Sequence, residues 1–196
     1  MSSSTTYPDR VRLPLNYDAG RMLAEVQAMD LNHFIHYNVL PLRSPAHFVD
    51  PSLPAPPPAD DYADGSWTEW ANTKTLQNSP YLKSIVDSFC EHTNVTLVRV
   101  LRLAAGNTVE RHTDPTLGLE VHKSVVRLTI PISGNDEVEF LLNDTPVPMQ
   151  AGECWYMRLT DPHQVNNPGT TERINLTIDM IPNEWLRSMI KNAAQA

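Results

Sequence analysis

Cysteine, lysine and long apolar runs are scarce in this sequence, and each shortage excludes a class of protein. Two cysteines, Cys90 and Cys154, are too few for a disulfide framework. Lysine and arginine number 15 against 23 acidic residues, and the net charge of −8 argues against binding to nucleic acid or to anionic membranes. No apolar run approaches the length of a membrane span, and the first ten residues lack a signal-peptide core. We therefore expect a reduced, cytoplasmic protein.

Glycine is also scarce, with 7 residues, whereas proline is abundant, with 17. Seven of the prolines lie between Pro41 and Pro58. Because proline removes backbone donors and favours extended conformations, we predict a loop over residues 41–66. The aromatic residues beside this stretch suit a lid over a site, and an ordered surface loop is an equal alternative.

Helical periodicity is confined to three segments, near residues 18–29, 79–92 and 183–192. We expect Asp18 and Ser79 to cap the first two helices, with Pro80 at the first helical position of the second. The apolar stripes of these segments are typical of helices that pack on a core.

Between Asn94 and Ile181 the apolar period changes to two. The runs, separated by turn residues, are VTLVRVLRL, SVVRLTIPI, VEFLL, ECWYMRL and RINLTIDMI. This pattern predicts an antiparallel sandwich or barrel, with Trp155 in its core and Cys154 as a small buried hydrophobe. One face of several runs is polar, which fits either a solvent-facing side or a ligand-holding interior.

The stretch Arg111-His112-Thr113-Asp114 carries a candidate metal site. Residues two apart on an extended strand point the same way, so His112 and Asp114 would present an imidazole and a carboxylate to one point. The triplet is weak alone, but His163 begins a new strand after a turn. Two histidines and one carboxylate leave positions open on a metal, as in non-haem Fe(II) oxygenases, where O₂ and a chelating cosubstrate must both bind.

Arg173 lies ten residues beyond His163, with a turn at residues 167–169 midway. We expect a hairpin that returns Arg173 beside His163 on the neighbouring strand. There the guanidinium would pair with the distal carboxylate of 2-oxoglutarate, whose other end chelates the metal. A surface arginine paired with Glu172 is the plain alternative. Two hydroxyls are candidates for a further bond to this cosubstrate: Thr177 and Thr129.

These residues together resemble a known family. His112-x-Asp114, His163 and Arg173 look like the Fe(II)/2-oxoglutarate-dependent oxygenases. More narrowly, residues 98–182 are similar to the aspartyl/asparaginyl β-hydroxylase family, which includes bacterial proline cis-4-hydroxylases. The matching pieces, in collinear order, are VRVLRLAAGNTVERHTD, VVRLTIPI, FLLNDTPVPMQAGECWYM, DPHQVNN and ERINLTIDM.

The resemblance implies a mainly β fold, a double-stranded β-helix of jelly-roll or cupin-like type with a few helices packed outside. It implies iron bound by His112, Asp114 and His163, with 2-oxoglutarate held by Arg173. We expect one oxygenase domain over residues 1–196. Its parts would be N-terminal helices and the proline-rich loop (1–93), the β-helix core (94–182) and a C-terminal helix (183–196).

Two departures from the family's pattern bear on the substrate. The vertebrate peptidyl hydroxylases have glycine where this chain has Asp114, which places the chain with the small-molecule branch. In the family's Arg-x-His motif Arg127 is retained, where the resemblance implies contact with a carboxylate, but Thr129 replaces the histidine. His122 near the cavity mouth and Trp67 beside the proline-rich loop are further candidates for substrate contact. The remaining histidines have no partner at metal-compatible spacing and are expected to be structural: His33, His36, His47 and His92.

The activity that we expect is hydroxylation of an unactivated C–H bond in a free amino acid or small carboxylated metabolite, with Fe(II), 2-oxoglutarate and O₂, and release of succinate and CO₂. Ascorbate is a candidate activator and a homodimer a candidate assembly. Three alternatives stay open: a peptidyl Asp/Asn β-hydroxylase, a natural-product tailoring oxygenase that hydroxylates or desaturates, and a protein of another class. The last would be a cupin-like Zn or Mn metalloprotein or a non-catalytic ligand-binding subunit.

Overall fold

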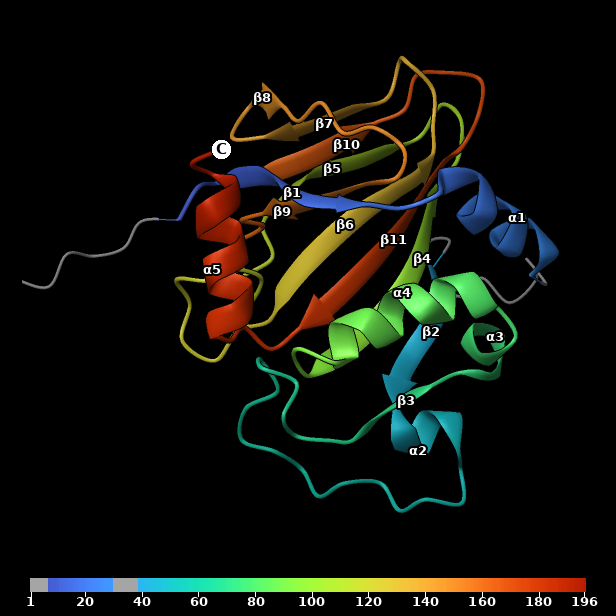
Figure 1. The fold of residues 1–196 in the computed structure, drawn as a ribbon, viewed down its shortest axis with the longest axis vertical. Coiled ribbons are helices and arrows are strands. Elements are labelled where there is room, and N and C mark those ends of the chain that lie inside the picture. Colours follow the sequence, from blue (N-terminus) through green and yellow to red (C-terminus); the bar gives the residue numbers. More distant parts are fainter. Residues whose placement is uncertain (1–6, 30–38) are drawn as a thin grey trace, which may run out of the picture.

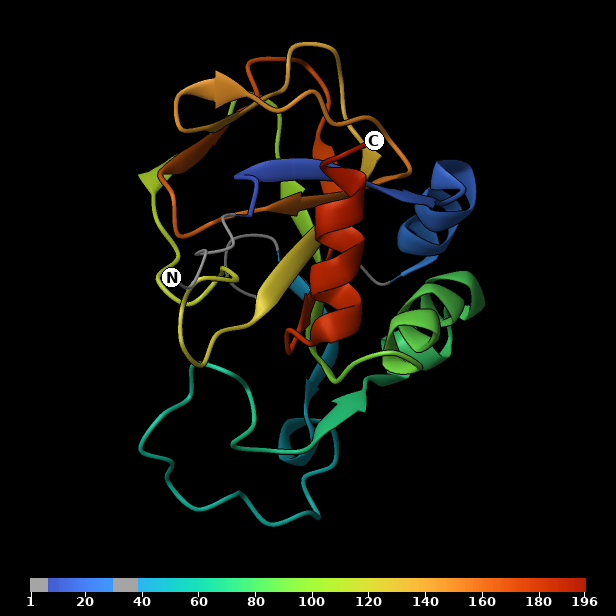
Figure 2. The ribbon, with the colours of Figure 1, turned by 60° about the vertical axis from the view of Figure 1, so that its left-hand side comes forward.

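The computed structural model describes residues 7–29 and 39–196. In these ranges two antiparallel β-sheets pack face to face, and the longer helices cover the outer side of the larger sheet (Figures 1 and 2). His33 and His36, which we expected to be structural, lie outside the described residues. None of the helices in the described ranges is long and apolar enough to span a membrane.

The strands of the described ranges are shared between a seven-stranded and a four-stranded sheet. The larger sheet contains, in spatial order, β1 (Arg10–Asn16), β9 (Glu153–Met157), β6 (Val126–Ser133), β11 (Arg173–Met180), β4 (Val95–Leu103), β2 (Val39–Pro45) and β3 (Trp70–Asn72). The smaller sheet contains β5 (Thr108–His112), β10 (His163–Asn166), β7 (Glu139–Leu142) and β8 (Thr145–Pro146). The chain passes repeatedly from one sheet to the other, which confirms the predicted double-stranded β-helix class.

Three of the helices match the predicted segments: α1 (Ala19–Ala28), α4 (Pro80–Cys90) and α5 (Glu184–Ala193); two single-turn helices are α2 (Ala46–Val49) and α3 (Lys74–Gln77). Asp18 caps α1 as expected, because its side chain accepts a hydrogen bond from the Arg21 amide at 3.0 Å. Ser79 is the N-cap residue of α4 and Pro80 begins the helix, as predicted, but the Ser79 side chain makes no capping hydrogen bond, because its hydroxyl donates to the Thr75 carbonyl. The Glu25 carboxylate of α1 instead accepts the Tyr81 and Leu82 amides, which ties α1 to the start of α4.

The core divides into two apolar clusters, one on each side of the larger sheet. The outer cluster joins this sheet to the helices and includes Val98, Leu128, Leu176, Leu82 and Leu186. The inner cluster lies between the sheets and includes Phe140, Leu142, Trp155, Met157 and Val165. Each such side chain stabilises the fold by about 1.5–3 kcal/mol. Trp155 is thus in the core as predicted, and burial raises the pKa of the Cys154 thiol, consistent with its expected role as a small buried hydrophobe.

The polar residues that alternate with the outer cluster turn toward the smaller sheet. Thr129, Asn175 and Asp179 are all buried there. The polar face of these strands is therefore the interior of the sandwich and not its solvent-facing side.

Two segments differ from the sequence-based expectations. The loop predicted over residues 41–66 begins later, because Pro41 and Pro45 belong to β2, which is followed by α2. Proline is tolerated in β2 because the register shifts between Pro41 and Arg43, as at a β-bulge. No strand was expected for residues 10–16, which form β1 at an edge of the larger sheet.

Candidate metal centre

His112 and His163 face each other across the pairing of β5 with β10. They are register partners, and their ring centroids lie 4.3 Å apart. The Nδ1 atom of His112 lies 2.7 Å from the Glu110 carbonyl oxygen, and that of His163 lies 3.0 Å from the Asp161 carbonyl oxygen. A carbonyl can only accept, so both Nδ1 atoms donate, and the tautomer that this selects in a neutral ring has the lone pair on Nε2, where a metal can bind.

Asp114 completes the cluster from just beyond the end of β5. Its backbone amide donates to the Leu159 carbonyl at 2.8 Å, which fixes the chain after the strand. Its Oδ2 atom lies 3.7 Å from Nε2 of His163. One ligand atom from each of His112, Asp114 and His163 lies within 4.8 Å of the others, which makes these three a candidate metal site among the described residues.

The surroundings of His163 keep it in the form that binds metals. Burial lowers its pKa, and the neighbouring His112 lowers it further. His163 is therefore neutral at pH 7. His112, by contrast, is exposed, so the cluster is open to solvent on the side of His112.

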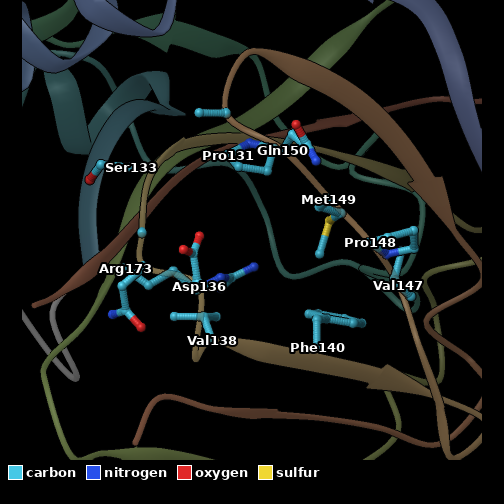
Figure 3. Close-up of a pocket in the computed structure, with 13 residues that line it drawn as sticks. Pro131, Ser133, Asp136, Val138, Phe140, Val147, Pro148, Met149, Gln150 and Arg173 are labelled. Atoms are coloured by element: carbon cyan, nitrogen blue, oxygen red, sulfur yellow. The ribbon is translucent and has the colours of Figure 1, made fainter. Parts of the chain in front are cut away.

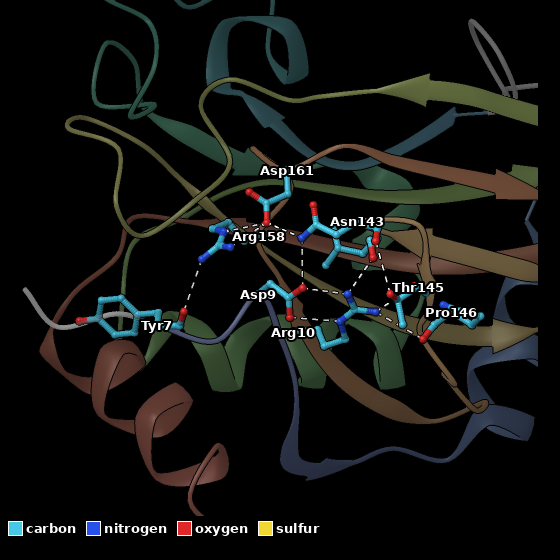
Figure 4. Close-up of polar contacts among 9 residues, drawn as sticks. Tyr7, Asp9, Arg10, Asn143, Thr145, Pro146, Arg158 and Asp161 are labelled. Carbon is cyan, nitrogen blue, oxygen red and sulfur yellow. Dashed lines mark hydrogen bonds and ion pairs between the residues drawn. The ribbon is translucent and has the colours of Figure 1, made fainter.

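A polar network holds the segment that leads into His163 (Figure 4). The Asp161 carboxylate accepts hydrogen bonds from Nε and Nη2 of Arg158 at 3.0 and 2.8 Å and from the Asn143 amide at 2.7 Å. Asn143 also donates to Asp9, the residue before β1. This network fixes Asp161, whose carbonyl orients the imidazole of His163.

Arg127 of β6 reaches the cluster from the larger sheet. Its Nε and Nη2 atoms donate to Asp179 at 2.7 and 2.8 Å, and Nη1 lies 3.6 Å from Oδ2 of Asp114. Burial opposes the charge of Arg127, but the attraction of Asp179 and Asp114 raises its pKa above the usual value. Arg127 therefore carries a permanent positive charge beside Asp114.

The cluster lies on the wall of a cavity of about 650 Å³ between the two sheets. Arg173 lines the same cavity, as the sequence predicts, but by another route. The expected hairpin is wrong: β10 belongs to the smaller sheet and β11 to the larger one, so the turn is a crossing between sheets. Asn167, fully buried, holds this crossing by donating to the carbonyls of Leu103, Ala104 and Thr171.

The guanidinium of Arg173 is held without a protein carboxylate in the part of the chain that the structure describes. Its carbon atom lies 5.8 Å from the centroid of the Phe140 ring. With the Asn175 amide turned so that its oxygen accepts, that oxygen lies 2.5 and 3.0 Å from Nη1 and Nη2 of Arg173. Burial lowers the pKa of Arg173 to about 10. An arginine so placed is ready to receive an anionic ligand.

A second cavity, of about 400 Å³, also reaches Arg173. Figure 3 shows Arg173 and Phe140 with Val138, Met149 and Gln150 around this hollow. Arg173 and Phe140 line both cavities, so the two share a wall at the guanidinium.

Of the other residues predicted to contact cosubstrate or substrate, some line the main cavity and others do not. Thr129 lines the main cavity. Thr177 does not line it, and its hydroxyl donates to the Arg99 carbonyl at 3.4 Å. His122 is exposed in a bend and is not among the lining residues. Trp67 lines a neighbouring hollow of about 260 Å³ that also touches Asp114 and Arg127.

Among the residues of the main cavity that sequence reasoning did not assign to a site are Arg99 and Asn175. Both lie on strands whose residues alternate between the faces of the sheet. The signal was present in the alternation, which places Asn175 on the same side as Arg173. For Arg99, alternation in the strand does not by itself show which face of the sheet is the interior.

Comparison with known proteins agrees with this geometry. The model of a family described as aspartyl/asparaginyl beta-hydroxylase matches residues 62–182, more than half of the chain. A curated relative, the L-proline cis-4-hydroxylase of Rhizobium meliloti (strain 1021), is 24% identical over 123 residues, which is 63% of this chain. The match covers 43% of the relative, so this chain spans less than half of the relative's length.

Solved structures share the fold. A 2OG-Fe(II) oxygenase family oxidoreductase from Burkholderia pseudomallei has a TM-score of 0.56 at 14% identity, covering 88% of this chain and 84% of its own. A structure described as non-heme monooxygenase ThoJ, apo, has a TM-score of 0.53 at 15% identity, covering 88% and 74%. At these identities the likeness concerns the arrangement of the sheets. The match of the family model over residues 62–182, which include every residue of the candidate metal centre, means that the chain belongs to the aspartyl/asparaginyl β-hydroxylase family.

Proposed function

We propose that this protein is an Fe(II)- and 2-oxoglutarate-dependent hydroxylase that acts on an unactivated C–H bond of a small carboxylated molecule, with a free amino acid as the first choice. The observation that carries the proposal is one cavity lined by the His112, Asp114 and His163 cluster and by the buried Arg173. Family membership and the proline hydroxylase relative support the same reaction class.

The donor set fits ferrous iron. Two neutral imidazoles and one carboxylate are the ligands of the non-haem Fe(II) oxygenases, and they leave positions open for other molecules. In this chain His112, Asp114 and His163 would hold the ion. When bound, iron supplies the activation of O₂ that is coupled to oxidation of 2-oxoglutarate to succinate and CO₂ and to oxygen insertion into a C–H bond.

The chain's own residues bind and orient the reactants. Arg173 would bind the distal carboxylate of 2-oxoglutarate with two parallel hydrogen bonds, and Asn175 would keep the guanidinium in place. Thr129 is available from the same cavity wall. The side chains that would exclude water are apolar: Leu101, Leu103, Phe140, Leu159 and Val165.

The charge of Arg127 gives Asp114 a fixed electrostatic partner. At 3.6 Å, Nη1 of Arg127 attracts the Asp114 carboxylate and restricts its orientation. Two of the three guanidinium nitrogen atoms of Arg127, Nε and Nη2, donate hydrogen bonds to Asp179. Contact between Arg127 and a substrate carboxylate stays a prediction, and only Nη1 is available for it.

An anaerobic titration tests the proposal. Metal-free protein is titrated with Fe(II) and then with 2-oxoglutarate while the visible spectrum is recorded. We expect a weak absorption band that requires both components. The band should be lost in Asp114→Ala and need far more 2-oxoglutarate in Arg173→Met. The exposed Arg12→Met variant, at a distant edge of the sheet, serves as control.

The spectrum has two informative outcomes. A band with these dependences justifies screening amino acids for stimulated succinate release. If the folded, metal-bound protein shows no band, the cluster serves another metal chemistry, and Zn(II) and Mn(II) become the metals to test.

A further inference from the structure

Arg99 is a cavity arginine whose charge the protein does not neutralise by hydrogen bonding. It lies in the middle of β4 on the inner face of the larger sheet, and it lines the same cavity as His112, Asp114 and His163. About a fifth of its side chain, 21%, is exposed.

The polar atoms of Arg99 are short of acceptors. Its Nε and Nη2 atoms are buried and have no hydrogen-bond partner among the described residues. Nη2 lies 3.8 Å from Oδ2 of Asp179, which is too far for a hydrogen bond. Burial, and then the charge of Arg127, lowers the pKa of Arg99 to about 10. A guanidinium removed from water in this way is strongly stabilised by an anion that brings acceptors.

The other cations of the cavity are already engaged or assigned. Arg127 donates twice to Asp179. Arg173 is the proposed partner of 2-oxoglutarate. The Nε atom of Arg102 lies 3.6 Å from a carboxylate oxygen of Glu172.

Charge balance leads to the same residue. Arg99, Arg127 and Arg173 carry three positive charges near two carboxylates, Asp114 and Asp179, while Arg102 and Glu110, which also line the cavity, cancel each other. A divalent ion adds two positive charges, and 2-oxoglutarate removes two. One positive charge is left over, on the residue whose nitrogen atoms lack acceptors.

We propose that Arg99 binds the carboxylate of the molecule that is hydroxylated, so that the substrate is an acid with one carboxylate held against β4 and the rest of the molecule directed away from it. This inference rests on the proposed function and names the substrate class of that same cavity. It assigns substrate recognition to Arg99, whereas Arg127 positions Asp114. The rest of such a substrate would extend toward the metal cluster along the apolar wall.

Ligand binding to the whole protein tests the proposal. Wild-type protein, loaded anaerobically with Fe(II) and 2-oxoglutarate, is titrated calorimetrically with the proteinogenic L-amino acids, with acetate and benzoate, and with the primary amide of each acid that binds. We expect at least one acid to bind and its amide to bind far more weakly. Arg99→Met should raise the dissociation constant of the acid on the order of 100-fold, since two charge-assisted hydrogen bonds are lost. Arg99→Lys should recover part of that loss.

Controls separate this proposal from the one on which it rests. The 2-oxoglutarate-dependent absorption band should be unchanged in Arg99→Met, and Arg12→Met should bind every ligand as wild type does. Absence of the band in wild type would refute the oxygenase and this inference with it. A normal band with equal binding of acid and amide, with no acid bound, or with binding unaffected by Arg99→Met would overturn the inference alone. Loss of binding in Arg102→Met but not in Arg99→Met would also overturn it.

Discussion

Asp179 accepts hydrogen bonds from Nε and Nη2 of Arg127 at 2.7 and 2.8 Å, inside the polar face of the larger sheet. Only 5% of the Asp179 side chain and 16% of the Arg127 side chain are exposed. The two residues therefore form a buried ion pair, and Arg127 also lies close to Asp114, one of the candidate metal ligands. Its removal should affect stability more than it affects chemistry.

Breaking this pair should be strongly destabilising. Asp179→Ala leaves Arg127 and Arg99 with less compensating charge, and we expect the free energy of unfolding to fall by about 3–5 kcal/mol. Urea unfolding at pH 7 measures the change. The double variant Arg127→Met/Asp179→Leu removes both charges and should recover most of the loss. An Asp179→Ala protein as stable as wild type would contradict the buried-pair description.

The three metal-ligand candidates should differ in what their loss does to the apo-protein. His112→Ala should keep the thermal stability, because His112 is exposed, whereas His163→Ala removes a buried ring stacked 6.0 Å from Phe140. We expect a loss of about 1–3 kcal/mol for His163→Ala. Both variants, and Asp114→Ala, should bind Fe(II) more than about 100-fold more weakly. Metal content after loading and dialysis checks this, and stoichiometric iron in any of them would remove that residue from the site.

Arg173 should matter for the cosubstrate and little for the fold. We expect Arg173→Met to raise the KM for 2-oxoglutarate on the order of 100-fold or more, because the distal carboxylate loses a bidentate partner. The Tm of the apo-protein should stay the same or rise, since Arg173 is desolvated without a carboxylate among the described residues. Steady-state kinetics and thermal denaturation measure the two effects. An unchanged KM would exclude the assigned role.

The network of Figure 4 should make stability depend on pH in the acid range. The hydrogen bonds from Arg10 lower the pKa of Asp9. Burial alone would raise the pKa of Asp161, but the hydrogen bonds from Arg158 and Asn143 outweigh burial, so the pKa of Asp161 is also lowered. Groups with a lowered pKa in the folded state stabilise it above their unfolded value, about 4, and that stabilisation is lost as the pH falls through the folded value.

Urea unfolding at pH 7, 5 and 3 tests this sign. We expect the free energy of unfolding to drop between pH 5 and 3 and to drop less in Asp161→Asn. The same variant should bind Fe(II) about tenfold more weakly at pH 7, because the carbonyl that orients His163 is less firmly held. A wild-type protein equally stable at pH 3 and pH 7 would show that the network contributes nothing.

Much of the fold could be read from residue patterns. The alternation in VTLVRVLRL corresponds to β4 residue for residue, and the three long helices lie where their apolar stripes and Asp18 indicate. β2 could not be predicted, because Pro41 and Pro45 favour loops wherever a bulge or an edge does not accommodate them. That accommodation depends on strands far away in the sequence.

The candidate site was predictable as a set of residues but not as a path of the chain. His112, Asp114 and His163 follow from their spacing and strand context, and they do form one cluster. Arg173 reaches the cavity because the chain crosses to the other sheet, and the buried Asn167 holds that crossing through hydrogen bonds to the carbonyls of Leu103, Ala104 and Thr171. Spacing alone does not distinguish a hairpin from such a crossing. Arg99 could not be assigned to the cavity from the sequence for a similar reason, since a lone arginine in a strand does not show which face of the sheet is the interior.

The placement of the two binding groups on opposite sheets has a consequence for size selection. His112 and His163 lie on the smaller sheet and Arg173 on the larger one, and packed sheets are about 10 Å apart. A diacid with one end on the metal and the other on Arg173 would have to bridge the part of that gap that these side chains leave open, so the separation of the sheets would select the length of the cosubstrate. Met157, in the core between the sheets, helps to set the gap. Thinning the core there by Met157→Ala should change the preference between 2-oxoglutarate and the longer 2-oxoadipate without altering any group that binds them.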